Sequence, residues 1–190
     1  MGLAQHTVCL VQAARWGLGP DLLREQLACA SAAGASEPWR AAVDALSAWL
    51  ATQKGKSLRL HVVLSGRFVR WQLLPWRAEL SGRSETQAYA GVRFRETFGK
   101  LADAWDILPV AMPPGKTAPA CAVDKALITA LEAACAEHGA RLQVLTPYFS
   151  SDFDAWRIAV DGSGLPWVTT APGDLFRLTP RQASFKITSD

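Results

Sequence analysis

The sequence predicts a mixed α/β (α+β) fold, and three observations support this class. Apolar runs typical of strands recur along the chain, for example at residues 6–14 and 58–64. Two amphipathic stretches, beginning at Ser36 and Asp124, have the spacing of helices. Between residues 68 and 145 the expected elements follow the order strand, helix, strand, strand, helix, strand, the order of a ferredoxin-like βαββαβ unit.

Length and composition indicate a folded domain. The chain has 190 residues, of which 49% are hydrophobic and 19% charged, enough for one compact core or a core with a small lobe. The 20 basic and 17 acidic side chains leave a formal charge of +3, so we predict no nucleic-acid partner. Charged residues interrupt the apolar stretches, and the start of the chain lacks a signal peptide's basic region. We therefore expect a cytoplasmic protein that does not span the membrane.

The four cysteines are widely spaced and form no C-x-x-C pair. No histidine stands at zinc-ligand spacing from any of them. They are therefore predicted to pack as small hydrophobic side chains; they are Cys9, Cys29, Cys121 and Cys135.

The N-terminal part predicts a hairpin followed by a helix. Residues 6–14 are apolar and β-prone, and residues 17–21 carry a turn signal. Residues 22–32 suit a returning strand, although their alanines also suit a helix. Ser36 is expected to begin a helix with Pro38 in its first turn. Its buried face would consist of Trp39, Val43, Leu46, Trp49 and Leu50.

The next segment predicts two strands and a helix. Residues 58–64 are almost continuously apolar, as expected for a central strand covered on both faces. Residues 67–76 form a second strand that Pro75 stops. Residues 84–87 read S-E-T-Q, the form of a capping box, so a helix should run from here to about Phe98.

The following elements complete the ferredoxin-like order. Residues 104–110 and 118–123 predict two short strands joined by a turn at residues 113–115. Asp124 is expected to cap a strong helix, and residues 141–145 predict the last strand.

Beyond residue 147 the elements are shorter. We expect a short helix capped by Ser151, a linker at residues 162–164, and two or three strands between residues 167 and 188 with a turn at residues 171–174.

Two segments resemble catalytic motifs but lack glycines that these motifs require. Residues 113–117 end in the G-K-T of a P-loop, but Val110 stands where the motif needs glycine, and a strand is expected to follow instead of a helix. Ser65 follows a buried strand as a nucleophilic serine would, but Val63 and Arg67 replace the glycines of the nucleophile elbow. Both segments are interpreted as turns.

Two further pairs suggest metal ligands and have simpler interpretations. Asp152 and Asp154 could hold a divalent cation, but acids in the first turn of a helix also offset its dipole. Cys135 and His138 are only two ligands, too few for a zinc site. We predict no catalytic, cofactor-binding or metal-binding residue and no bound cofactor.

One segment suggests a surface for a protein partner. Residues 67–77 interleave basic and aromatic side chains densely, and Trp and Arg dominate binding energy at protein interfaces. A sheet strand whose arginine stems lie along apolar neighbours would account for the same pattern. The candidate partner-binding residues are Arg67, Arg70, Trp71, Trp76 and Arg77.

Three segments together resemble a known family. These are V-L-S-G-R-F-V-R-W-Q-L-L-P-W at residues 63–76, A-C-A-V-D-K-A-L at residues 120–127, and L-T-P-Y at residues 145–148. The chain resembles the actin-like cytoplasmic platform proteins of type IV pili and type II secretion systems, the PilM-like and GspL-like proteins, over roughly its first 160 residues.

The resemblance implies three parts. Residues 1–66 would form an actin-like, ribonuclease-H-like subdomain, residues 67–147 an inserted ferredoxin-like unit, and residues 148–190 a returning helix and the start of a partial second subdomain. It further implies a non-catalytic scaffold that binds the cytoplasmic tail of an inner-membrane pilus or secretion platform protein. Peripheral location at the inner membrane and homo-oligomer formation are left open.

The chain departs from the ATP-binding members of this fold. Those place an acidic residue at the end of strand one, whereas residues 10–14 here read L-V-Q-A-A. Because a metal-bound triphosphate would lack this anchor beside Gln12 and Gly17, we expect nucleotide binding to be lost or to lie outside the given sequence. A divergent actin-like ATP-binding protein is the alternative, and a hydrolase that uses Ser65 is a third hypothesis.

Overall fold

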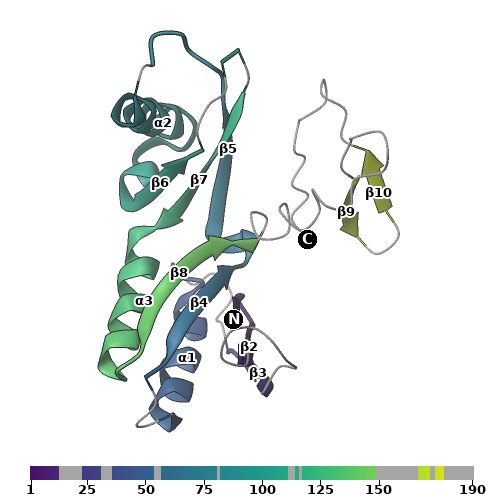
Figure 1. Ribbon diagram of the computed structural model, residues 1–190, viewed down its shortest axis with the longest axis vertical. Coiled ribbons are helices and arrows are strands. Elements are labelled where there is room, and N and C mark those ends of the chain that lie inside the picture. The colour runs from purple at the N-terminus through teal and green to yellow at the C-terminus, as the bar shows by residue number, and fades with distance from the viewer. Residues whose placement is uncertain are drawn as a thin grey trace. The chain divides into compact units, whose positions relative to one another are not determined.

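The computed structural model describes residues 1–12, 23–30, 36–53, 57–80, 82–110, 114–115, 117–148, 167–171 and 174–177. Its internal contacts divide the chain into one unit from Met1 to Pro147 and another from Tyr148 to Asp190. The predicted mixed α/β class is confirmed (Figure 1). The three-part division at residues 66 and 147 stays a prediction.

Within the described residues, five strands of the first unit form one sheet, called the first sheet below. Its order is β3-β2-β1-β4-β8. β1, β4 and β8 are parallel, and β1, β2 and β3 form an antiparallel meander. The predicted N-terminal hairpin and its returning strand are therefore confirmed, while β1 is too short for periodicity to reveal. The strands are β1 (Gly2–Leu3), β2 (Thr7–Gln12), β3 (Leu23–Ala28), β4 (Arg59–Leu64) and β8 (Arg141–Pro147).

β4 is an interior strand, as predicted, but only one of its faces is buried. Leu60, Val62 and Leu64 are buried, whereas Arg59 and His61 are exposed. The prediction of a strand covered on both faces is therefore wrong. The alternation of buried and open positions is hard to see in the sequence because Val63, on the partly open face, is also apolar.

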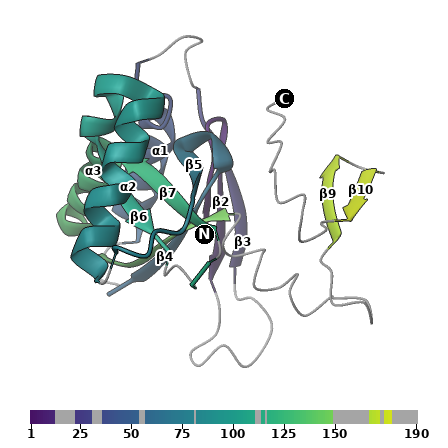
Figure 2. The ribbon, with the colours of Figure 1, turned by 90° about the horizontal axis from the view of Figure 1, so that it is seen from above.

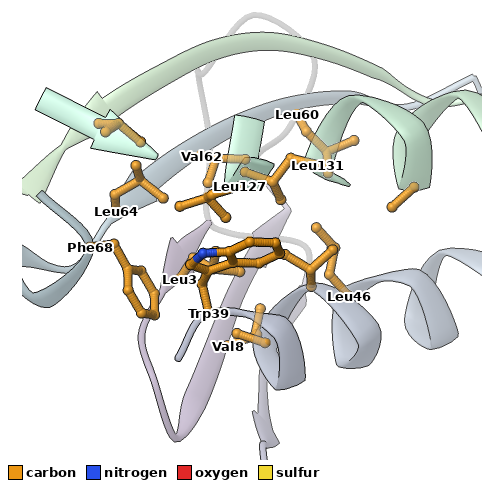
Figure 3. Packing of buried hydrophobic residues seen from close by; sticks show 14 of the residues in the cluster. Leu3, Val8, Trp39, Leu46, Leu60, Val62, Leu64, Phe68, Leu127 and Leu131 are labelled. Carbon is orange, nitrogen blue, oxygen red and sulfur yellow. The ribbon is translucent and has the colours of Figure 1, made fainter. Parts of the chain in front are cut away.

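Two helices, α1 (Arg40–Thr52) and α3 (Lys125–Glu137), lie on the same side of the first sheet (Figure 2). Their apolar stripes and the inner face of the sheet form a single core, with the Trp39 ring at its centre (Figure 3). Burial of apolar surface contributes roughly 25 cal/mol per Å² removed from water, so this core stabilises the unit. Its fully enclosed members include Leu3, Val8, Leu46, Leu64, Leu127 and Leu131.

The ends of these helices match the predictions unequally. Asp124 caps α3 as expected, since its Oδ1 accepts a hydrogen bond from the Ala126 amide at 2.8 Å. Ser36 does not cap α1, which begins four residues later at Arg40. The intervening residues form a turn instead. The Arg40 amide donates a hydrogen bond to the Glu37 carbonyl at 3.0 Å, and the two side chains form an ion pair of 2.7 Å.

A second, antiparallel sheet holds three strands in the part of the chain that the structure describes, in the order β5-β7-β6. The strands are β5 (Val69–Leu74), β6 (Trp105–Pro109) and β7 (Ala118–Asp124). α2 (Arg83–Phe98) packs on one face of this sheet, on the side of β6 and β7 in Figure 1. The core between them consists of Leu74, Ala90, Phe94, Ala102, Ile107, Ala120 and Ala122.

The predicted ferredoxin-like unit is wrong in the place of its last helix and its last strand. β8 was expected to be the fourth strand of the second sheet, but it pairs in parallel with β4 in the first sheet. The reason is that the buried residues of α3, such as Leu127 and Leu131, belong to the core of the first sheet. The chain therefore returns from α3 to the first sheet, and residues 69–124 are the part that builds the second.

Two boundaries in this region also differ from the predictions. Arg67 and Phe68 lie in a 3₁₀ turn (Gly66–Phe68), so β5 begins two residues later than expected. The S-E-T-Q segment is not a capping box, because the N-cap of α2 is Gly82 and Ser84 lies inside the helix. The Gln87 side chain does not turn back to the cap. It donates a hydrogen bond to the Ile107 carbonyl of β6.

The second unit contains a hairpin that the sequence predicted. β9 (Trp167–Ala171) and β10 (Asp174–Arg177) pair antiparallel. The expected helix at Ser151 and linker at residues 162–164 lie outside the described residues. None of the helices in the described segments has both the length and the hydropathy that a bilayer span requires.

Candidate binding surfaces

The five predicted partner-binding residues lie along β5 and beyond both of its ends. Arg67 is in the 3₁₀ turn before the strand, and Arg70 and Trp71 are on the strand. Trp76 and Arg77 follow it. Because β5 has six residues at about 3.3 Å each, its ends lie about 20 Å apart.

Arg67 and Arg70 come together at the start of β5. The Arg70 guanidinium donates to the Arg67 carbonyl at 3.0 Å and to the Val69 carbonyl at 3.4 Å. Arg67 donates to the Gln5 side-chain oxygen at 3.3 Å, which ties it to the turn between β1 and β2. Both arginines are exposed. They form a small basic patch beside the carboxyl end of β1.

Trp71 lies on the other face of β5 from Arg70. It is half-buried and packs against the core of the first sheet, so its main contribution is to packing. Trp76, 39% exposed, and the exposed Arg77 form a separate patch beyond the far end of the strand. The structure thus divides the predicted surface into two patches, and whether either binds a partner stays a prediction.

The carboxyl ends of β1, β4 and β8 meet at one edge of the first sheet, where open α/β sheets commonly bind ligands. The turn after β1 contains Gln5 and His6. It is closed by a hydrogen bond that the Ala4 amide donates to the Thr7 carbonyl at 2.9 Å. The residue after β4 is Ser65. The first turns after these two strands therefore carry no carboxylate.

This edge corrects the sequence-based placement of the phosphate-binding hairpin. The sequence predicts residues 6–14 as the first strand, but β2 is the second strand and runs antiparallel to β1. Gln12 therefore ends β2 near the amino ends of β1 and β4, at the opposite edge of the sheet. Gly17 lies outside the described residues. The turn that follows the first strand contains Gln5 and His6 and no acidic residue.

The rejected catalytic motifs lie in turns, as predicted. Pro114 and Gly115 form the turn between β6 and β7, with Gly115 at φ 70°, and a strand follows where a P-loop would need a helix. The Ser65 hydroxyl accepts a hydrogen bond from the Arg67 amide at 3.4 Å. No hydrogen bond joins it to a histidine among the described residues.

The suspected metal ligands that the structure describes have structural partners instead. Cys135 is buried in the core, and His138 Nε2 lies 2.9 Å from the Ser47 hydroxyl of α1. The described residues contain no cluster of three side chains suited to a metal ion. Asp152 and Asp154 lie outside them.

Three of the four thiols pack as the sequence predicts. Cys29, Cys121 and Cys135 are buried and free, and burial raises the pKa of each thiol. Cys9 is an exception. It is exposed because it lies on the outward face of β2 between the buried Val8 and Leu10.

A cleft that sequence reasoning missed lies between the second sheet and the edge of the first. Its volume is about 270 Å³. One wall is formed by β6 and β7, and the other by α3, β4 and β8. Leu108 and Val144, 49% and 41% exposed, are among its lining residues, and two carboxylates, Asp106 and Glu132, also line it. Alternation in β6 could have placed Asp106 and Leu108 on one face, but no sequence signal shows that this face is open.

Comparisons with known proteins give a likeness among solved structures. No protein-family model matches the chain, and the search of curated proteins finds no match. Among solved structures, the chain is similar to the cytoplasmic domain of EpsL, an inner-membrane component of the type II secretion system of Vibrio cholerae. The TM-score is 0.54 and the identity 11%, over 77% of this chain and 54% of that one.

This likeness is one of fold. It confirms the predicted resemblance to the secretion platform proteins at that level. The chain spans about half the length of the domain that it matches.

Proposed function

We propose that this chain is a non-catalytic scaffold of a type II secretion or type IV pilus assembly platform. One observation carries the proposal: the shared fold with the EpsL cytoplasmic domain. On this proposal the protein works in the cytoplasm, at the inner membrane, where it binds the cytoplasmic tail of a membrane-embedded partner. The parallel strands β1, β4 and β8 with the β1-β2-β3 meander would be its actin-like subdomain.

The carboxyl edge of the first sheet supports the non-catalytic part of the proposal. A triphosphate with its magnesium ion needs oxygen ligands, and carboxylates are the usual protein contribution. The turns after β1 and β4 offer an amide, an imidazole and a hydroxyl, in Gln5, His6 and Ser65. Titration with a fluorescent ATP analogue and magnesium checks this point, and saturable binding in the micromolar range would contradict it.

The partner-binding part is tested with the two patches at the ends of β5. Synthetic peptides covering the cytoplasmic tails of the inner-membrane secretion and pilus components from the same genome are titrated against the full chain. The first variant is Arg67→Glu with Arg70→Glu, and the second is Trp76→Ala with Arg77→Glu. Arg83→Glu, an exposed arginine at the start of α2, is the matched control.

The expected result is one peptide whose binding falls at least about tenfold in one double variant and is unchanged in the control. Trp71→Ala is not used, because loss of its packing would confuse binding with stability. If no tail peptide binds the wild-type chain, the proposed partner binding is contradicted. If binding survives in both double variants, neither patch is the binding surface.

A further inference from the structure

β8 is the last strand of the first sheet, and its outer edge has no neighbour among the described strands (Figure 1). The Arg141 amide donates a hydrogen bond to the Leu58 carbonyl at 2.9 Å, so the backbone groups of Arg141 point toward β4. Because these directions alternate along a strand, the N–H and C=O of Leu142 point the other way, toward the open edge. Backbone groups at such an edge can pair with a strand of another chain.

The other sheet edges of the first unit carry features that hinder pairing. On β3, the Glu25 carboxylate points toward α1, where it accepts an indole N–H at 2.9 Å. On β5, Arg70 donates to backbone carbonyls at the start of the strand, and Pro75 follows its end. On β6, Gln87 of α2 donates to a backbone carbonyl, and Pro109 has no N–H. Such features protect edge strands. The middle of β8 contains no charged residue and no proline.

A β-bulge decides which side chains of β8 share a face. The pairing register with β4 shifts by one residue, so Gln143 and Val144 both stand opposite His61. Both lie on the outward face, and Gln143 Oε1 is 3.1 Å from His61 Nε2. Leu142 and Leu145 lie on the inner face, where they pack against the core. Because these two leucines share a face, the backbone groups of both point to the open edge.

This pattern is the same in both directions along the strand. From residue 141 to residue 146 the side chains lie outward, inward, outward, outward, inward and outward. A second β8 can therefore run antiparallel with a twofold axis between Gln143 and Val144. Leu142 would then stand opposite Leu145 of the second copy. Their backbone groups both face the junction, so the two residues can exchange a pair of N–H···O=C bonds.

The inner leucines would gain cover from this pairing. Leu142 and Leu145 are only partly buried, because the core ends at this edge. Both line the cleft of about 270 Å³, together with Ile128 of α3. The leucines of a second copy would reach the inner face beside this hollow. Their arrival would remove apolar surface from water on both copies.

Charge favours the antiparallel orientation over the parallel one. Arg59 and Arg141 are Cα partners at the starts of β4 and β8, and both are exposed. In the antiparallel pair the two copies of Arg141 are about 17 Å apart, which is beyond a Debye length of about 8 Å. A parallel pair would bring them side by side, where like charges repel. An antiparallel pair of identical edges is also closed and stops at two copies.

We propose that the β8 edge is an interface between two copies of this chain, which pair antiparallel about a twofold axis. Leu142 is hydrogen-bonded to Leu145 of the second copy, and Val144 lies beside the axis. This surface is distinct from both patches of β5, so the inference goes beyond the proposed function and does not depend on it. Because the contact is short, the dimer is weak and forms reversibly as concentration rises.

Sedimentation velocity of the full chain tests the proposal. Between about 5 and 500 μM it should show a monomer–dimer equilibrium with a Kd on the order of 100 μM. Val144→Lys should raise the Kd at least about tenfold, because it places two ammonium groups beside the axis. Val11→Lys is the matched control, since Val11 is 48% and Val144 41% exposed, and it should leave the Kd unchanged. Urea unfolding establishes that each variant is folded.

A charge-reversal pair locates the axis. Val144→Glu should also weaken self-association, because it brings two carboxylates together. An equimolar mixture of Val144→Lys and Val144→Glu should dimerise again at low salt, since each axis then carries one cation and one anion. Loss of folding in either variant could not produce this recovery.

Several results would overturn the proposal. One is a wild-type chain that stays monomeric over the whole concentration range. Another is a dimer that Val144→Lys leaves intact or that Val11→Lys weakens equally, which would place the interface elsewhere. Failure of the mixture to recover would exclude an axis beside Val144. A monomer that binds an extended Val/Thr peptide, and loses this binding in Val144→Lys, would assign the edge to a strand of another protein.

Discussion

The indole N–H of Trp39 donates a hydrogen bond to Asp124 Oδ2 at 3.4 Å, across 85 positions of sequence. Trp39 immediately precedes α1, and Asp124 is the residue that caps α3. One carboxylate therefore satisfies the first turn of one helix and the buried indole at the start of the other. This contact fixes the starts of α1 and α3 next to each other over the first sheet.

Removing this carboxylate should destabilise the first unit in two separable parts. Asp124→Ala loses the helix cap and leaves the buried Trp39 N–H without an acceptor, at a combined cost of about 1–3 kcal/mol. Asp124→Ser keeps a capping oxygen but is too short to serve both donors, so it should fall between wild type and Asp124→Ala. Urea unfolding measures the order. Asp103→Ala, which breaks only the exposed ion pair with Arg95, should change stability by less than about 1 kcal/mol. Equal stability of the Ser and Ala variants would show that the cap contributes nothing.

Two glycines of α2 should respond in opposite directions to the same substitution. Gly99 ends the helix at φ 64° and ψ −146°, a conformation that residues with a Cβ rarely adopt, so Gly99→Ala should cost about 1–3 kcal/mol. Gly91 lies inside the helix, and a Cβ there meets nothing within 4 Å. Gly91→Ala should therefore stabilise the protein by about 0.5–1 kcal/mol. Thermal unfolding of both variants checks the signs, and a stabilising Gly99→Ala would contradict the helix end described here.

The start of α2 distinguishes the sequence interpretation from the structure. A capping box would make Ser84→Ala cost about 1 kcal/mol. In the structure Ser84 is inside the helix, so this substitution should be neutral or slightly stabilising.

Gln87→Ala should cost about 0.5–1.5 kcal/mol, because the Ile107 carbonyl loses its donor. It also opens the β6 edge, so light scattering should show more self-association in this variant than in Ser84→Ala.

Local patterns predicted the elements well, and the differences arise where contacts distant in sequence decide. The Asp124 cap is visible in sequence because an acid precedes an apolar helical stripe. The strand that pairs with β8 is not visible in the sequence, since the pattern of residues 141–145 would suit either sheet. The buried face of α3 decides between the two sheets. Gln87 has the residue type of a capping box, and only the proximity of β6 shows its actual role. The cleft was missed for the same reason.

The buried thiols make the stability of the first unit sensitive to alkaline pH. Burial raises the pKa of Cys121 and Cys135 above the ordinary value of 9.0, with smaller contributions from the carboxylates of Asp106 and Glu132, respectively. Above about pH 9 the unfolded chain loses these protons while the folded chain keeps them, so the free energy of unfolding falls as pH rises. Below that value both states are protonated, and the two thiols add no pH dependence.

The corresponding measurement is urea unfolding between pH 7 and pH 10.5 under reducing conditions. Wild-type stability should decline as the pH rises through the upper part of this range. Cys135→Ala removes one contributing group, so it should lower stability at pH 7 through the lost packing and yet flatten the alkaline decline. Parallel curves for wild type and Cys135→Ala would mean that this thiol ionises equally in both states. In that case the decline would come from other groups, and the burial of Cys135 would carry no linkage to pH.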